Sequence, residues 1–226
     1  MKYTRLSYAI TPSSPCWPRN PPFVAEPYTL MDKGDVCNTF LLHLFEHNGT
    51  HMDAPNHYVA TGKKIAELSM DNFIFTKPLL LDIPRGSMEK IGKEDLLPFA
   101  QDIASCDLLL IRTGFSVKRE TDPLLYAESG PSVSASAAQY LVETFGAHLK
   151  ALAVDFISLA CPKDPSDGDL AHQYLLGGKQ KDFICIIEDV NLSLYPKGRV
   201  SRVSAIPLFM DGVDSSPVTM FAESEE

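Results

Sequence analysis

Residues 47–57 of the chain read HNGTHMDAPNH, and this short segment holds three of the six histidines together with one aspartate. His43 lies just upstream, so four histidines fall within residues 43–57. Imidazole and carboxylate groups are the donors that Zn²⁺, Mn²⁺ and Fe²⁺ take in proteins. The density of these side chains indicates either a metal site or a polar loop that happens to be rich in histidine.

A helical zinc-protease site is the first interpretation to exclude. His47 and His51 are four residues apart, as two histidines are on the helix of such proteases. However, residues 48–50 are Asn-Gly-Thr, which are poor helix formers, and Pro55 follows closely. Asn48 also stands where the protease motif has its catalytic glutamate. The segment is therefore not predicted to be a helix.

An extended chain explains the spacing better, because side chains alternate between the two sides of a strand. In an extended segment four donors project to the same side, namely His47, His51, Asp53 and His57. Gly49 allows a bend or a close approach of the backbone, and Pro55 favours a turn. His43 is also odd-numbered and would lie on the same side of an unbroken strand. It lies in an apolar run, however, so we expect it to be packed or hydrogen-bonded.

The composition of the whole chain is that of an ordinary globular domain. Its 226 residues are 45% hydrophobic and 22% charged, and this length predicts a single domain over residues 1–226. The net charge of −9 disfavours nucleic acid and anionic membranes as partners. The short basic stretches at 118–120 and 179–182 also contain acidic residues, so neither predicts a basic patch.

The N-terminal segment and the cysteines indicate where the protein resides. Residues 1–15 carry charge without an apolar run, so no secretory signal is predicted, and no stretch approaches the ~20 apolar residues of a membrane span. The five cysteines are odd in number, widely spaced and free of C-x-x-C pairs, which is typical of reduced thiols. We expect a soluble cytoplasmic protein.

Apolar runs of strand length predict a mixed α/β fold. They occupy residues 39–45, 78–83, 107–111, 151–157 and 183–187. Several are continuous rather than alternating, which is typical of strands covered on both faces.

Two segments between these runs are predicted to be helical. Residues 131–150 have Ser132 or Ser134 as N-cap candidates and Gly146 near the end. The expected buried face consists of Ala137, Tyr140, Leu141 and Phe145. Residues 92–103 form a weaker candidate, because Pro98 interrupts it.

Segment 47–57 matches His-x-Gly-Thr-His-x-Asp-x-Pro-x-His at all seven fixed positions. In this it resembles the cyclase family, which includes bacterial kynurenine formamidase and isatin hydrolase. The resemblance extends over most of the chain through three weaker segments: ITPSSPCWPRNPP (10–22), LLLIRTGF (108–115) and AHQYLLGGKQKDFICIIEDV (171–190). Arg19 and Asn20 depart from it, since they stand where Gly-Asp is common in the family.

The resemblance implies a divalent metal, Zn²⁺ or Mn²⁺, with one or two ions per subunit. His47, His51 and Asp53 would bind one ion, and Asp53 would bridge to a second ion held by His172 and Glu188. Extra residues around 177–182 lengthen the interval between His172 and Glu188, which leaves the number of ions open. Glu188 also follows directly after the apolar run at 183–187. If its carboxylate is buried there, it needs a partner or a metal. The alternative is that Glu188 ends the strand and points into solvent.

The resemblance assigns roles to three further residues. His57 would be the general acid and base rather than a metal ligand. Asp155, which follows the apolar residues 151–154, would support the metal ligands from behind or help to position the substrate. Trp17, the only tryptophan, lies beside prolines and would line an apolar substrate pocket near an interface between subunits.

The fold implied by the resemblance is a three-layer β/β/α domain with a barrel-like mixed sheet. The implied reaction is hydrolysis of a C–N amide bond, linear as in N-formylkynurenine or cyclic, by hydroxide that the metal generates from water. A homodimer or a higher homo-oligomer is expected. Two alternatives keep the site but change its use: a metal-assisted cyclase or dehydratase, and a non-catalytic metal-binding dimer module.

Other catalytic motifs are missing from the sequence. Residues 177–179, Gly-Gly-Lys, lack the frame of a phosphate-binding loop, and no Gly-x-Ser-x-Gly elbow occurs. Cys106 and Cys161 carry no nucleophile motif, so we expect them to be structural thiols.

Overall fold

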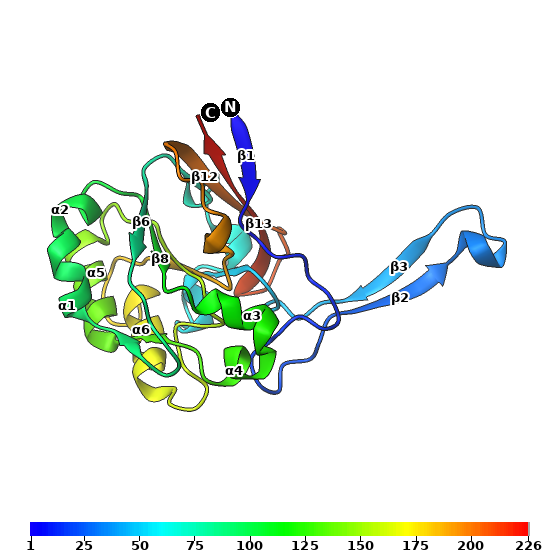
Figure 1. Ribbon diagram of the computed structural model, residues 1–226, viewed down its shortest axis with the longest axis horizontal. Helices are drawn as coiled ribbons and strands as arrows, with labels where there is room; N and C mark the ends of the chain where they lie inside the picture. Colours follow the sequence, from blue (N-terminus) through cyan, green and yellow to red (C-terminus); the bar gives the residue numbers. More distant parts are fainter. Residues whose placement is uncertain (226) are drawn as a thin grey trace.

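The computed structural model describes residues 1–225, which form a mixed α/β fold around a nine-stranded sheet (Figure 1). The strands of this sheet are β1 (Lys2–Arg5), β4 (His51–Asp53), β5 (Ile74–Phe75), β6 (Pro78–Asp82), β8 (Leu108–Arg112), β10 (Ala151–Val154), β11 (Cys185–Glu188), β12 (Val200–Pro207) and β13 (Ser215–Ser224). Their order is β5-β12-β13-β4-β11-β10-β8-β6, and β1 pairs with β13.

Four of the predicted apolar runs form the parallel part of this sheet, β6-β8-β10-β11. Alternate residues of these strands are buried in two different cores. Leu109 and Leu152 belong to the core on the helical side, whereas Leu108 and Ala153 belong to the core shared with Met220 of β13. Burial on both faces explains why β8, β10 and β11 are continuously apolar, and the prediction is confirmed for these three. The fourth strand, β6, is the last in the sheet order, and Leu81 is its one buried residue.

The helices cover one side of the sheet. They are α1 (Lys93–Leu96), α2 (Ala100–Ile103), α3 (Lys118–Thr121), α4 (Pro123–Glu128), α5 (Ala135–Phe145) and α6 (Ser166–Leu175). In Figure 1, α1, α2, α5 and α6 lie on one side of β6 and β8, while β12 and β13 lie on the other. This arrangement is the expected three-layer β/β/α fold with a barrel-like mixed sheet.

The two predicted helices differ slightly from expectation. Ser134 is the N-cap of α5, since its hydroxyl accepts a hydrogen bond from the Ala137 amide. Tyr140 is only partly buried, and Ala138 and Val142 occupy the buried face instead. Residues 92–103 form two short helices, α1 and α2, which a 3₁₀ turn containing Pro98 separates. The break at Pro98 was expected from its missing N–H group.

The predicted strand at residues 39–45 is real, but its expected burial is wrong. β2 (Val24–Thr29) and β3 (Thr39–His43) pair with each other in a separate two-stranded sheet. The hairpin, residues 24–43, projects from the body of the molecule, and we call it the arm (Figure 1). Every residue of β3 is exposed. His43 was expected to be packed or hydrogen-bonded; it is not packed in a core, but its Nε2 atom lies 3.3 Å from Oε1 of Glu26.

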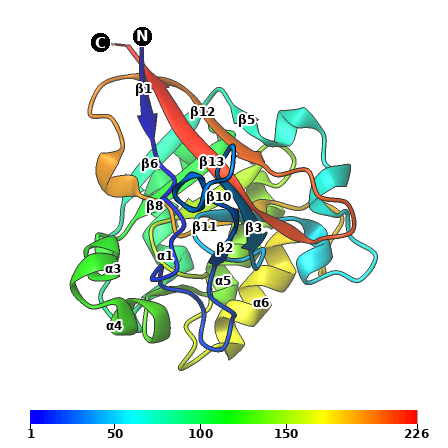
Figure 2. The same cartoon turned by 90° about the vertical axis from the view of Figure 1, so that its right-hand side faces the viewer.

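A third small sheet pairs β7 (Lys90–Ile91) with β9 (Ser132–Val133). The first strand of the chain pairs with the last, because β1 runs antiparallel to the end of β13, with Lys2 opposite Ser224 (Figure 2). Among residues 1–225, the structure contains no helix that is both long and apolar enough to cross a membrane.

Candidate metal centre

The segment 47–57 is extended only along β4, so the expectation of one continuous extended segment is wrong on both sides of residues 51–53. Before β4 the chain turns at Gly49, whose φ is +70°. A side chain there would also collide with Ile10, since an added Cβ would lie 2.9 Å from Ile10 Cγ1. After β4, residues 55–57 form a 3₁₀ turn that begins at Pro55. The imidazoles of His47 and His57, which lie before and after β4, come side by side with ring centroids 4.4 Å apart.

The position of β4 in the sheet brings distant carboxylates to the motif. β4 lies between β11 and β13 and is antiparallel to both. In this register His51 faces Glu188 of β11, and His51 Nε2 lies 3.3 Å from Glu188 Oε2. Glu188 is only 3% exposed, so it does not turn into solvent.

His172 reaches the same carboxylate from helix α6. Its Nε2 atom lies 3.3 Å from Glu188 Oε1, and the imidazole is buried. The extra residues 177–182 follow α6, which ends at Leu175, and precede β11. They therefore lengthen a connection without moving the helix turn that carries His172, in line with the small entropic cost of lengthening a loop.

Asp53 lies at the centre of the cluster. Its Oδ1 atom is 3.2 Å from His47 Nδ1 and 3.6 Å from His51 Nε2. The residue is fully buried, and neither of its carboxylate oxygens accepts a hydrogen bond from the part of the chain described, residues 1–225. A buried carboxylate without donors is costly, so a cation is needed to offset this charge.

The tautomers of two histidines support a metal ion as that cation. His51 Nδ1 lies 2.8 Å from the carbonyl oxygen of Gly49, and His172 Nδ1 lies 2.8 Å from that of Gly168. A carbonyl oxygen can only accept a hydrogen bond, so the Nδ1 atom of each ring carries a proton. When the ring is neutral, its Nε2 atom has a free lone pair, which points at Glu188. Second-sphere bonds of this kind orient histidine ligands of metals.

Without a metal the carboxylates hold protons on the histidines. Burial lowers the pKa of His47, but the nearby carboxylates of Asp214 and Asp53 outweigh this effect and raise it to about 10. Burial also lowers the pKa of His51 and of His172. Contact with the Glu188 carboxylate outweighs burial in both cases, so the pKa of each histidine is raised. Burial raises the pKa of Glu188, yet its histidine contacts bring it down to about 2. The carboxylates of this cluster therefore favour positive charge on the groups beside them.

Two overlapping donor sets fit divalent metals. The donor atoms of His51, Asp53 and Glu188 lie within 4.8 Å of one another, and so do those of His47, Asp53 and His57. Asp53 belongs to both sets, and nitrogen donors combined with carboxylate oxygens suit Zn²⁺ and Mn²⁺ alike. The residues present therefore fit a divalent ion, whose identity they leave open.

His57 has a partner that the sequence did not reveal. Its Nδ1 atom lies 2.5 Å from Oδ2 of Asp214, which directly precedes β13. The same oxygen is 3.7 Å from Nε2 of His47. Asp214 lies in the stretch Asp-Gly-Val-Asp-Ser-Ser-Pro at 211–217, which matches no pattern used above. Only the pairing of β13 with β4 brings it to the motif.

A cavity of about 290 Å³ opens over these donors. Its lining includes Trp17, Asn20, Phe45, Tyr58 and Asp169 in addition to four of the histidines, His47, His51, His57 and His172, and Glu188. Tyr58, which the sequence also did not single out, stacks on His172 with ring centroids 4.7 Å apart. Its hydroxyl donates to Asp169.

Asp155 is not brought to this cavity. Its buried carboxylate accepts hydrogen bonds from the amides of Thr113 and Gly114 and from the hydroxyl of Thr113. Burial raises the pKa of Asp155, against the effect of these donors. In this structure Asp155 fixes the turn after β8 and is not among the residues that line the cavity, so its proposed part in positioning a substrate stays a prediction.

Comparisons with known proteins identify the family and the fold. The model of the family described as "Putative cyclase" matches residues 4–160. A kynurenine formamidase from Bacillus cereus is 30% identical over 203 residues, which cover 89% of this chain and 88% of that protein. The fold is similar to that of isatin hydrolase A from Labrenzia aggregata, with a TM-score of 0.82, 18% identity, and coverage of 100% and 94% of the two chains. A structure described as a potential metal-dependent hydrolase with cyclase activity gives a TM-score of 0.76, 22% identity, and coverage of 100% and 98%.

Proposed function

The chain belongs to the "Putative cyclase" family, and from this premise we propose that it is a metal-dependent hydrolase that cleaves the C–N bond of an amide. The observation that carries the proposal is the buried cluster around Asp53, whose carboxylate lies among histidines and accepts no hydrogen bond within residues 1–225. We further propose that one domain, residues 1–226, is sufficient for the activity.

Two sets of ligands share Asp53 in this proposal. His47, His51 and Asp53 would hold one ion, and Asp53, His172 and Glu188 would hold a second. A divalent metal would supply Lewis acidity, which lowers the pKa of water and polarises a carbonyl oxygen. Glu188 keeps its orientation because its Oε1 accepts hydrogen bonds from the amide of Leu159 at 2.7 Å and from the hydroxyl of Ser158 at 3.0 Å.

His57 would carry the proton in the reaction. With Nδ1 held by Asp214, its Nε2 atom is the free nitrogen of a ring that lines the cavity. In the neutral ring Asp214 keeps the proton on Nδ1, so Nε2 can take a proton from the attacking water and return it to the leaving nitrogen. Asp214 also stabilises the imidazolium that exists between these two transfers, as the aspartate does in catalytic triads.

The cavity limits the substrate to a small molecule. A volume of about 290 Å³ lies at the lower end of the range for ligand pockets. Trp17, Phe45 and Tyr58 provide aromatic surface for one ring. The names of the relatives, kynurenine formamidase and isatin hydrolase, support an aryl formamide such as N-formylkynurenine, or a related linear or cyclic amide.

The decisive experiment is product analysis with the purified, metal-loaded protein. Hydrolysis of N-formylkynurenine or of a panel of small aryl amides releases one amine and one carboxylate per turnover. A cyclase or dehydratase would release water and no free carboxylate. A non-catalytic metal-binding module would bind the ion and leave the whole panel unchanged.

The metal, the assembly and the location complete the proposal. Zn²⁺ or Mn²⁺ suits the mixed nitrogen and oxygen donors.

A homodimer or a larger homo-oligomer is supported by the exposed arm, whose base adjoins the cavity through Asn20 and Phe45. A cytoplasmic location is supported by the five unpaired cysteines.

A further inference from the structure

A second cavity, which we call the side cavity, adjoins the metal cavity through Trp17, whose side chain lines both. Its volume is about 330 Å³. Its walls are Trp17, Pro18, Arg19, Glu128, Pro162 and Lys163. Two of these residues are cations and one is an acid, although the chain as a whole carries a net charge of −9. The side cavity is therefore a place on an acidic protein where positive charge is in excess.

The same two segments of the chain form walls of both cavities. In the N-terminal segment, Asn20 lines the metal cavity and its neighbour Arg19 lines the side cavity. In the segment before α6, Ala160 lines the metal cavity and Pro162 lines the side cavity. Because adjacent residues line the two spaces, one elongated ligand can place one end at the metal donors and the other end in the side cavity.

The backbone of Arg19 has a conformation that suits glycine better than arginine. The amide of Asn20 donates to the carbonyl of Trp17 at 3.0 Å, which closes a turn. Pro18 occupies the second position of this turn and Arg19 the third, where its φ is +78°. A positive φ at the third position is typical of a type II turn, which favours glycine there because a Cβ is unfavourable. An arginine held in such a conformation indicates a function for its side chain.

Both cations of the side cavity are available to an anion. Within residues 1–225, the guanidinium of Arg19 forms no ion pair and donates no hydrogen bond to another residue. The Nζ atom of Lys163 lies 3.9 Å from Oε2 of Glu128, and both of these side chains are exposed. An exposed pair at this distance contributes little, so Glu128 competes only weakly with an incoming anion.

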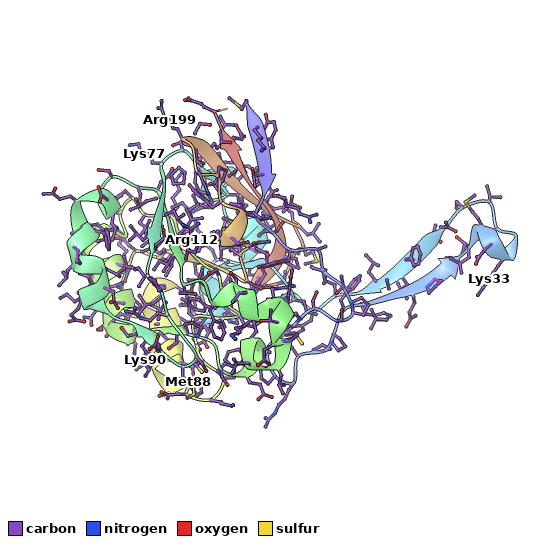
Figure 3. The ribbon with its side chains drawn as sticks, viewed as in Figure 1. Lys33, Lys77, Met88, Lys90, Arg112 and Arg199 are labelled. Carbon is purple, nitrogen blue, oxygen red and sulfur yellow. The ribbon has the colours of Figure 1, made fainter. Side chains whose placement is uncertain are left out.

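The acids that follow Lys163 in the sequence are paired elsewhere. Lys90 of β7, which Figure 3 labels, has its Nζ atom 3.2 Å from Oδ2 of Asp164 and 3.1 Å from Oδ2 of Asp167. The amide of Asp164 also donates to the carbonyl of Cys161 at 3.0 Å, which closes the turn that carries Lys163. The turn is therefore held in place, and its own acids do not offset the charge of Lys163.

We propose that the side cavity binds a carboxylate that the substrate carries away from its scissile amide, with Arg19 as the main contact and Lys163 as the second. This rests on the proposed function and narrows the substrate to an aryl amide with an anionic side chain. A guanidinium presents two parallel N–H donors to the two oxygens of a carboxylate, and an ammonium group adds a point charge. Trp17 would contact the aromatic ring between the two polar ends. Elsewhere the net charge of −9 repels such a substrate, so a local excess of positive charge is needed to hold it.

A binding measurement tests the site without any reaction. Trp17 is the only tryptophan, so the fluorescence of the metal-loaded protein reports ligands in both cavities. The probes are phenylbutanoate and its uncharged counterpart phenylbutanol. Wild type should bind the carboxylate at least ~10-fold more tightly than the alcohol, as expected for a hydrogen bond to a charged group. In Arg19→Gly this preference should disappear, whereas Arg19→Lys should keep part of it.

Arg199→Gly is the matched control, because it also replaces an arginine with glycine. Figure 3 shows Arg199 and Lys90 at opposite sides of the molecule, and Arg199 forms only an exposed ion pair with Glu225 at 3.8 Å. The control should keep the preference of wild type for the carboxylate. Thermal unfolding should show that Arg19→Gly is folded, since glycine suits its place in the turn. A preference that Arg19→Gly retains, or a loss that Arg199→Gly shares, would overturn the proposal.

Kinetics distinguish failure of the side cavity from failure of the proposed function. N-formylkynurenine and its methyl ester differ in the carboxylate. Wild type should have a kcat/KM at least ~10-fold higher for the acid than for the ester, and Arg19→Gly should lose this ratio through a higher KM for the acid. Hydrolysis of both compounds with the same ratio in wild type and Arg19→Gly would refute the carboxylate site and leave the hydrolase standing. Turnover of neither compound, with binding of phenylbutanoate that depends on Arg19, would refute the hydrolase and leave the carboxylate site standing.

Discussion

Nδ1 of His57 lies 2.5 Å from Oδ2 of Asp214, and 157 residues of sequence separate the two. The contact joins the last histidine of segment 47–57 to the residue that precedes β13. Because Asp214 also lies 3.7 Å from His47, one carboxylate faces both a proposed metal ligand and the proposed proton carrier. Three predictions concern this contact and the donors around it.

Replacing Asp214 with asparagine should slow the reaction and spare the fold. With an amide in place of the carboxylate, the imidazole of His57 could take either tautomer, so kcat should fall, by no more than the ~10²–10⁴-fold expected for removing a proton carrier. KM should change little, because Asp214 does not line the cavity. Steady-state kinetics at matched metal content check this, and Asp214→Glu should recover part of the rate. An unchanged kcat in Asp214→Asn would remove Asp214 from the mechanism.

Replacing His57 with glutamine should leave metal binding intact. If His57 moves protons and is not a ligand, the variant keeps the metal content of wild type and loses ~10²–10⁴-fold in kcat. Elemental analysis of the folded variant, together with turnover per bound metal, makes the distinction. A variant that loses metal but keeps its turnover per metal would make His57 a ligand instead.

Glu188→Gln should weaken one metal site and spare the other. Glutamine keeps the shape and can still accept the hydrogen bonds from Leu159 and Ser158, but it removes the charge that faces His51 and His172. Titration of Zn²⁺ or Mn²⁺ into the metal-free protein should show one equivalent bound as tightly as in wild type and one bound more weakly. Identical single-site isotherms for wild type and the variant would establish a mononuclear enzyme.

The apolar runs predicted most of the sheet but could not reveal the arm. Strands β8, β10 and β11 are buried on both faces, so their sequences are continuously apolar. The run at 39–45 looks the same in sequence, yet β3 is exposed along its length. Burial depends on what packs against a strand, and for β3 no such surface lies within residues 1–225. A run of residues cannot distinguish a strand in the core from a strand that is exposed.

The part of the site that lies in one short segment of sequence could be predicted from that segment. His47, His51, Asp53 and His57 lie within eleven residues, so their spacing alone indicated a cluster. Asp214 and Tyr58 were missed because no spacing rule marks them, and Asp214 arrives only through the pairing of β13 with β4. The roles of the clustered residues remain predictions, and the variants above test them.

Behind Glu188, a buried ion pair is expected to contribute to stability. Asp189 has a φ of +53°, and its carboxylate accepts hydrogen bonds from Arg119 Nε at 2.8 Å and from the Tyr126 hydroxyl at 2.6 Å. Arg119→Ala would leave this carboxylate buried and unpaired, which typically lowers the free energy of unfolding by ~3–5 kcal/mol.

Urea denaturation measures this effect against a surface control. Lys163 and Glu128 form an ion pair at 3.9 Å with both side chains exposed, so Lys163→Ala should change the free energy of unfolding by less than ~1 kcal/mol. Equal stabilities of Arg119→Ala and Lys163→Ala would show that the buried pair adds nothing.

The most direct test of a metal-dependent amide hydrolase is to remove the metal and restore it. Purified protein is stripped with a chelator, and release of formate and free amine from N-formylkynurenine is followed as Zn²⁺ or Mn²⁺ is added back, with Asp53→Asn treated identically. We predict that wild type loses its activity on stripping and regains it in proportion to bound metal, while Asp53→Asn folds but recovers neither metal nor activity. Undiminished turnover by the stripped, metal-free wild type would contradict the account.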